Sequence, residues 1–378
     1  MSQARPQIHS GEAPPVASLF GTPAIDCDVH IAVPSVRTLM PYLDPYWRQQ
    51  FSTRGIDRLS LNMTSDPPNA PISGRPDWRP AQGKAGTDIE LMRTACLDHF
   101  GARAAIANCI YGGVGLHSED LSIVVCRAIN DWVAAEWLAR EPRLRASIVV
   151  PLNAPDLAVE EIERLAGDRR FVQVLMLAMG TTPLGRRVNW PIYAAAAKHG
   201  LPIGIHAGSL YYQAPIPGGY GSYFLEDYVA QSFGFESALV SLVSEGVFAK
   251  FPDLKVVFME SGVTWMPAAV WRLEKTWRGV RAEVPWVRRP PSEIVREHIR
   301  LTVQPFDAPE GASRLERFCE QMSSDSMLLF STDFPHWQFD GDDALPVSPS
   351  SPLAAKILWD NPRATYPRLS LDETEVSA

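Results

Sequence analysis

Four residues of metal-binding type stand at the ends of apolar runs in this sequence of 378 residues. Asp28 and His30 end the run AIDCDVH two positions apart, and in a β-strand this spacing places both side chains on one face. His206 follows PIGI, and Asp333 follows LLFST. Carboxylate and imidazole ligands suit Zn²⁺, Mn²⁺ or Fe²⁺ and leave room for water or substrate. We therefore predict that these four residues hold one divalent metal ion, with zinc as the first expectation.

Each of these residues, taken singly, also has a structural explanation. A histidine at a strand end, such as His206, is often only hydrogen-bonded to its surroundings. Asp333 could cap the segment that follows it, because Asp is favoured at helix starts, and Asp28 could lie in a turn. The joint occurrence of such residues at three separate strand ends favours the metal site.

The elements that must position these residues alternate between two patterns. Short, β-branched, apolar runs occur at residues 24–30, 103–110, 146–152, 171–178, 202–208, 255–262, 299–305 and 328–334. Amphipathic segments lie between several of them, at residues 119–141, 158–166, 191–199 and 267–281. Near-continuous hydrophobicity is typical of strands buried on both faces, and the alternation of strand and helix indicates βαβ units with a parallel sheet.

Eight such strands predict an α/β fold of the (β/α)₈ or TIM-barrel type. An open doubly wound sheet is the alternative, but its nucleotide-binding form should carry GxGxxG after the first strand. Here the first strand continues as DVHIAVP, which offers no such loop. In a closed barrel the active site lies at the C-terminal ends of the strands, where the four candidate ligands stand.

The expected domain organisation is a single barrel at residues 24–361, between tails at 1–23 and 362–378. An insertion at about 35–86 follows the first strand and contains the Pro-rich segment 66–80. We expect it to lie over the catalytic face as a lid or dimer arm. A second long loop, at about 209–231, follows the fifth strand and is rich in Tyr and Gly, and loops of that length are usually functional.

Composition excludes several classes of protein. The net charge is −8 and the sequence has no dense stripe of Lys and Arg, which argues against nucleic acid as a partner. No apolar run reaches the length of about 18 residues that a membrane span needs, and the N-terminus lacks the apolar core of a signal peptide. The five cysteines contain no CxxC pair, which favours reduced thiols in the cytoplasm.

In these motifs the sequence resembles the amidohydrolase-related (amidohydrolase 2) family of metal-dependent barrels. That family includes aminocarboxymuconate-semialdehyde decarboxylase and γ-resorcylate decarboxylase. DVH looks like the strand-one motif HxH or ExH, with Asp28 and His30 in its two places. IHAG is similar to the strand-five motif through His206, and FSTDFPHW is similar to the strand-eight motif through Asp333. The resemblance covers about residues 24–361 and implies a metal-dependent enzyme.

One segment departs from the family pattern. The family's decarboxylases carry HxGxxxP after strand six, where the histidine has a proton-transfer or water-activating role. This sequence has ESGVTWMP, so that Glu260 takes the place of the histidine. A divalent cation nearby favours an ionised carboxylate. Glu260 is therefore a candidate general base, a fifth ligand, or a partner that orients His206.

Other candidates come from their places at the same rim. His336 could contact substrate, shuttle a proton or simply pack in its loop, and Gln304 at the end of strand seven could donate to a substrate oxygen. His298 precedes strand seven at the opposite face and is expected to be structural. Four aromatic residues are candidates for a pocket wall, although each could equally belong to the core or an interface: Trp265, Tyr211, Tyr212 and Trp337.

The resemblance also implies a homodimer. The segment 265–286 carries four Trp and several Arg, residue types that are enriched at interface cores. In the related decarboxylases an arginine after strand six reaches the neighbouring subunit's site, and Arg272 in AVWRLEK looks like its counterpart.

The function expected from the sequence is hydrolysis of a small, carboxylated or aromatic molecule by metal-activated water. Glu260 would take the proton, and Asp333 would serve both as ligand and in catalysis. The first alternative is nonoxidative decarboxylation of a hydroxybenzoate-like acid. The second is a barrel that binds a partner without catalysis.

Overall fold

The computed structural model describes residues 19–57, 59, 74–209, 219, 221–308, 314–337, 341, 344–345 and 347–369. Eight strands lie side by side in chain order, and each neighbouring pair is parallel. They are β1 (Ala24–His30), β2 (Ala102–Asn108), β3 (Leu144–Val149), β4 (Phe171–Met179), β5 (Ile203–Ser209), β6 (Val256–Met259), β7 (Ile299–Thr302) and β8 (Leu328–Leu329). The predicted parallel sheet of eight strands is confirmed.

The sheet closes on itself between its first and last strands. The backbone N–H of Cys27 donates to the carbonyl of Phe330 at 2.9 Å, and that of Asp333 donates to the carbonyl of Asp28 at 3.0 Å. Val29 and Phe334 form a parallel bridge at the same junction. These contacts join β1 to the segment after β8, so the fold is the predicted (β/α)₈ barrel.

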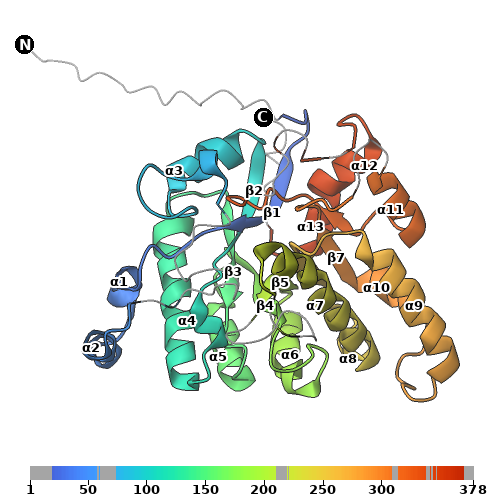
Figure 1. Ribbon diagram of the computed structural model, residues 1–378, viewed down its shortest axis with the longest axis horizontal. Helices are drawn as coiled ribbons and strands as arrows, with labels where there is room; N and C mark the ends of the chain where they lie inside the picture. The colour runs from blue at the N-terminus through green and yellow to red at the C-terminus, as the bar shows by residue number, and fades with distance from the viewer. Residues whose placement is uncertain are drawn as a thin grey trace, which may run out of the picture.

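Helices surround the strands (Figure 1). They are α1 (Val36–Leu39), α2 (Pro45–Arg54), α3 (Ile89–Met92), α4 (Glu119–Val133), α5 (Pro155–Leu165), α6 (Trp190–Lys198), α7 (Phe224–Ser244), α8 (Val247–Lys250), α9 (Trp265–Val280), α10 (Pro291–His298), α11 (Arg314–Met322), α12 (Pro352–Ala355) and α13 (Asn361–Thr365). The helix α4 illustrates why they form: Glu119 and Asp120 occupy its first turn, and Val125, Ile129 and Trp132 bury one face. No described helix is long and apolar enough to cross a membrane.

The insertion after β1 divides into two parts. The helices α1 and α2 lie at the outer edge of the molecule beside α4 (Figure 1), and the Tyr42 hydroxyl donates to Glu136 at 3.2 Å. Gly74, by contrast, pairs with His336 beyond β8, and the Trp78 ring packs on that of Phe334 at 5.1 Å. Residues 74–78 therefore lie against the loop that carries His336. A lid role for the insertion stays a prediction.

Both ends of the packed domain extend beyond the predicted limits of 24 and 361. Phe20 is buried and its ring lies 6.0 Å from that of Phe100 and 5.5 Å from that of Phe330. At the other end, α13 follows residue 361, and Tyr366 is completely buried. Burial of these aromatic rings stabilises the segments that carry them, so they are parts of the barrel and not tails.

Candidate metal centre

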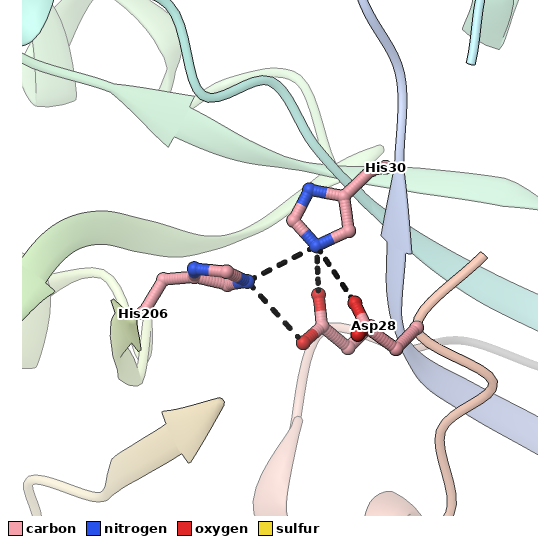
Figure 2. A group of neighbouring side chains, drawn as sticks. Asp28, His30 and His206 are labelled. Carbon is pink, nitrogen blue, oxygen red and sulfur yellow. Dashed lines mark hydrogen bonds and ion pairs between the residues drawn. The ribbon is translucent and has the colours of Figure 1, made fainter. Parts of the chain in front are cut away.

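The structure brings the four predicted ligands together at the C-terminal ends of the strands. Asp28 and His30 come from the end of β1, His206 from β5, and Asp333 from the turn after β8. Figure 2 shows the side chains of Asp28, His30 and His206 pointing toward one another. One ligand atom from each of the four residues lies within 4.8 Å of the others, and all four residues are buried.

The two imidazoles define the centre of the group. The Nε2 atoms of His30 and His206 are 3.0 Å apart. The Nε2 atom of His30 lies 3.1 Å from Oδ1 of Asp333, and that of His206 lies 3.5 Å from Oδ2 of Asp28. Nitrogen and oxygen atoms from β1, β5 and the turn after β8 thus face one small volume.

The donor atoms fit a cation. Nδ1 of His206 lies 2.7 Å from the carbonyl of Ala207 and donates to it, so Nε2 is the ring nitrogen that faces the cluster. Oδ2 of Asp28 and Oδ2 of Asp333 are buried without a hydrogen-bond partner among the described residues. Such carboxylate oxygens are costly to bury. A divalent metal ion held by two carboxylates and two imidazoles would satisfy all four groups.

Two residues at this site have strained backbones. Asp333 has φ of 54° and Glu260 has φ of 58°, in the left-handed region that residues other than glycine seldom adopt. The backbone N–H of Asp333 is held by Asp28, and that of Glu260 by the hydroxyl of Thr302 at 3.1 Å. Strain of this kind concentrates at functional sites, where surrounding contacts maintain it.

Glu260 directs its carboxylate into the cluster from the position after β6. Its Oε2 lies 3.2 Å from Nε2 of His206, and its Oε1 accepts a hydrogen bond from the hydroxyl of Tyr228 at 2.7 Å. Burial and the negative charge of Asp333 raise the pKa of Glu260 to about 7. A carboxyl group with this pKa can both hold and accept a proton near neutral pH.

His336 completes the edge of the site. Its Nδ1 lies 2.8 Å from Oδ1 of Asp333, and its ring lies 4.4 Å from that of His30. Burial opposes protonation, but the carboxylates of Asp333 and Glu260 outweigh it and raise the pKa of His336 to about 10. The same balance, with Asp28 and Glu260 as the carboxylates, raises the pKa of His206 to about 9.

Several predicted substrate-binding residues have other partners. Gln304 is completely buried and donates from its side-chain amide to the carbonyl of Ala344 at 3.0 Å. Trp265 packs against the rings of Phe235 and Phe258, and its indole donates to the carbonyl of Gly262. These contacts tie Gln304 to a loop and Trp265 to the core, and a role of either side chain in substrate binding stays a prediction.

The remaining candidates are dispersed. Tyr211 and Tyr212 lie outside the described residues. Trp337 is exposed and its ring lies 6.2 Å from that of Phe224. Arg272 is exposed on α9. His298, expected to be structural, is buried with Nδ1 2.8 Å from the carbonyl of Leu254.

Sequence reasoning missed two polar residues that contact the site. Tyr228 of α7 donates to Glu260, and Asn108 at the end of β2 donates to Oδ1 of Asp28 at 2.7 Å. Asn108 had a detectable signal, because it is a polar residue at the end of an apolar run, on the same rim as the ligands. Tyr228 follows a long loop and had no comparable signal.

With this geometry established, the chain can be compared with known proteins. The family model described as amidohydrolase matches residues 25–368. The γ-resorcylate decarboxylase of Polaromonas sp. (strain JS666 / ATCC BAA-500) is 24% identical over 306 residues, which cover 75% of this chain and 89% of that protein.

Two solved structures share the architecture. An amidohydrolase from Mycobacterium avium subsp. paratuberculosis K-10 has a TM-score of 0.69 at 21% identity, covering 93% of this chain and 99% of that chain. A dihydroxybenzoic acid decarboxylase from Polaromonas sp. JS666, with bound manganese and the inhibitor 2-nitroresorcinol, has a TM-score of 0.61 at 19% identity. The latter comparison covers 93% of this chain and 100% of that chain. At these identities the two structures establish a common fold.

Proposed function

The chain belongs to the amidohydrolase family, and on this basis we propose that it is a metal-dependent decarboxylase of a small hydroxylated aromatic acid. The observation that carries the proposal is the convergence of two carboxylates and two imidazoles, with Glu260 beside them. The name of the Polaromonas relative supports the substrate class. The sequence alone ranked hydrolysis first, and the relatives move decarboxylation ahead of it.

Asp28, His30, His206 and Asp333 would hold one divalent ion. When bound, that ion would orient the substrate through its oxygen atoms and stabilise the negative charge that develops on them. Decarboxylation breaks the bond between a ring carbon and the carboxylate carbon, and the electron pair left on the ring carbon must receive a proton. Glu260 and His336, whose pKa values are raised to about 7 and about 10, are the two groups at the edge that can carry it.

Hydrolysis is the second candidate, and Glu260 is the observation that favours it. A carboxylate at this position, in place of the family's histidine, is suited to take a proton from an attacking water molecule. Tyr228 would hold its Oε1 in place while Oε2 faces the cluster. The two functions thus differ in whether Glu260 gives or takes the proton.

The metal is proposed to be zinc or manganese. Zinc was the first expectation from the ligand types, manganese is bound in the related Polaromonas structure, and the donor set also accepts iron. Elemental analysis of the protein purified without added metal tests this, because it gives both the identity of the ion and its amount per chain.

A homodimer in the cytoplasm is the proposed context. On and after α9, the side chains of Trp271 and Trp286 are 53% and 39% exposed, beside the exposed Arg272. Aromatic residues and Arg in this arrangement are typical of subunit interfaces. The five cysteines are free thiols, which supports a reducing compartment. Light scattering at micromolar concentration tests the dimer, and a monomer would contradict it.

The experiment for the reaction separates the two chemistries. The metal-loaded protein is incubated in ¹⁸O-labelled water with a panel of hydroxybenzoates and with amides and lactones of similar size. Decarboxylation is supported if CO₂ is released in a molar amount equal to that of the product and the product contains no ¹⁸O. Incorporation of ¹⁸O without CO₂ supports hydrolysis and contradicts the first proposal.

A further inference from the structure

A row of polar side chains crosses the interior of the barrel next to the metal centre, where barrels of this type usually pack aliphatic residues. It consists of Asn108 of β2, Ser147 of β3 and Gln173 of β4, and it ends at Tyr366 after α13. All four side chains are buried. A buried polar row is costly unless its members satisfy one another, so the pattern of bonds within it is informative.

Every bond in the row points the same way. The Tyr366 hydroxyl donates to Oε1 of Gln173 at 3.2 Å, and Nε2 of Gln173 donates to the Ser147 hydroxyl at 2.7 Å. That hydroxyl donates to Oδ1 of Asn108 in a short hydrogen bond. Finally, Nδ2 of Asn108 donates to Oδ1 of Asp28 at 2.7 Å. The row therefore begins at a phenol and ends at a predicted metal ligand, and aligned bonds of this kind strengthen one another.

The row fixes the orientation of Asn108. Its Oδ1 accepts from both Ser147 and Gln173, so its amide nitrogen must face Asp28 and the sulfur of Met259, which lies 3.6 Å away. With both acceptor and donor sides occupied, the amide group cannot turn over without breaking several hydrogen bonds. Asn108 consequently presents a donor, and never an acceptor, to Asp28.

The bond from Asn108 distinguishes the two oxygens of Asp28. Each oxygen lies 3.5 Å from a histidine, Oδ1 from Nε2 of His30 and Oδ2 from Nε2 of His206. Asn108 occupies Oδ1, while Oδ2 has no hydrogen-bond partner among the described residues. We propose that Asn108 is a positioning residue that sets Oδ2 of Asp28 as the metal-binding oxygen, and that Ser147, Gln173 and Tyr366 hold Asn108 in that role. This inference rests on the metal centre of the proposed function.

Gly204 of β5 provides the space that the row needs. A Cβ atom at this position would lie 2.8 Å from Cδ and Oε1 of Gln173 and 2.8 Å from Cε of Met259. No side chain beyond hydrogen fits there without moving Gln173. The glycine in IGIH is thus explained by the neighbouring strand, and not by the conformation of its own backbone.

A buried Asn elsewhere in the barrel supplies a matched control. Asn130 of α4 is also completely buried, and its amide donates to Glu161 at 2.7 Å and to the carbonyl of Val149 at 2.9 Å. If the row around Asn108 only stabilised the fold, Asn108→Leu and Asn130→Leu would have similar effects. If Asn108 positions a ligand, only the former weakens metal binding.

The experiment measures the Kd of the full-length apo protein for Zn²⁺ and for Mn²⁺, by competition with a chromogenic chelator. We expect Asn108→Leu to raise Kd by about 10–100-fold, the usual effect of removing a partner that orients a metal ligand. Asn130→Leu should lower the melting temperature and leave Kd unchanged. Wild-type Kd in Asn108→Leu, or an equal loss in both variants, overturns the inference.

Tyr366→Phe tests the row with the least risk to folding, because it removes one hydroxyl and keeps the buried ring. We expect a smaller rise of Kd, of several-fold. Because Tyr366 acts only through Asn108, the double variant Asn108→Leu/Tyr366→Phe should bind metal no more weakly than Asn108→Leu alone. Additive losses of metal affinity in the double variant would contradict the role of the row in holding Asn108. Failure of the wild-type protein to bind either ion would instead overturn the metal centre itself.

Discussion

Two buried polar clusters in this barrel differ in one informative respect. In the first, the buried Asn130 and Glu161 join α4 and α5 to the end of β3, and both oxygens of Glu161 accept hydrogen bonds at 2.7 Å from Arg164, whose side chain is 37% exposed. In the metal centre, by contrast, one oxygen each of Asp28 and Asp333 has no hydrogen-bond partner among the described residues.

The backbone shows the same contrast. Asp333 and Glu260 have positive φ, whereas the three residues of the other cluster lie within regular helices. Buried polar groups that satisfy one another stabilise a fold, whereas unsatisfied carboxylates next to strained backbone indicate a ligand-binding site. The difference teaches that burial of charge alone does not identify a functional site.

The largest expected effect is on the metal centre. The double variant His30→Ala/His206→Ala removes both nitrogen ligands, so metal content should fall from about one ion per chain to background, and turnover with it. The melting temperature of the apo protein should also fall, because the buried carboxylates of Asp28, Asp333 and Glu260 lose the imidazoles that they face. Elemental analysis and a thermal melt in chelator measure both. Undiminished metal content would contradict the site.

The next effect concerns Glu260. Glu260→Gln keeps the size of the side chain and its contact with Tyr228, but the amide can neither give nor take a proton near neutral pH. Turnover should fall by about 10²–10⁴, the usual scale for loss of general acid–base catalysis, while metal content is retained. Loss of metal together with turnover would make Glu260 a ligand. Turnover equal to that of the wild type would remove it from catalysis and make His336 the better candidate.

A third effect concerns pH. The pKa of His206 in the folded protein is raised to about 9, so below that pH its imidazole carries a proton that must leave before Nε2 can bind metal. Metal affinity should therefore weaken as pH falls, by about tenfold per pH unit for each proton displaced. Calorimetry in buffers of different ionisation enthalpy measures the protons released. Affinity independent of pH between 6 and about 8 would contradict this.

The smallest expected effect on metal binding comes from the cluster of Asn130, Glu161 and Arg164. A substitution there should instead lower the stability of the fold. Asn130→Leu leaves the backbone of Val149 without its side-chain partner, and it should lower the free energy of unfolding by about 1–3 kcal/mol. Metal content and turnover should be unchanged. Chemical denaturation measures the first and elemental analysis the second. A variant that lost metal without losing stability would reverse the comparison.

Much of the barrel was predictable because its strands are buried on both faces. The run at residues 24–30 has the limits of β1, and every residue of β1 is buried. The predicted last strand, at 328–334, is reduced to Leu328–Leu329. The chain leaves the strand conformation before Asp333, whose positive φ no apolar pattern reveals. Strand limits at the functional rim were therefore the less predictable ones.

The candidate site was predictable only where ligand types and spacing coincided. Asp28 and His30 share one strand, so their geometry follows from a spacing of two. The role of Asn108 depends on the register that places it opposite His30 across β1 and β2, and a single sequence does not give that register. Tyr228 reaches the site from α7, after a loop whose path no local pattern determines.

The left-handed backbone at Glu260 and Asp333 has a consequence for laboratory evolution. Each such conformation costs about 1–3 kcal/mol in a residue other than glycine. Gly would relieve that cost at either position, and Asn would relieve part of it. A library selected for heat resistance alone should accumulate Gly or Asn at 260 and 333, whereas one selected for turnover should keep both carboxylates. Sequencing the two populations would show whether selection for stability replaces these two site residues before others.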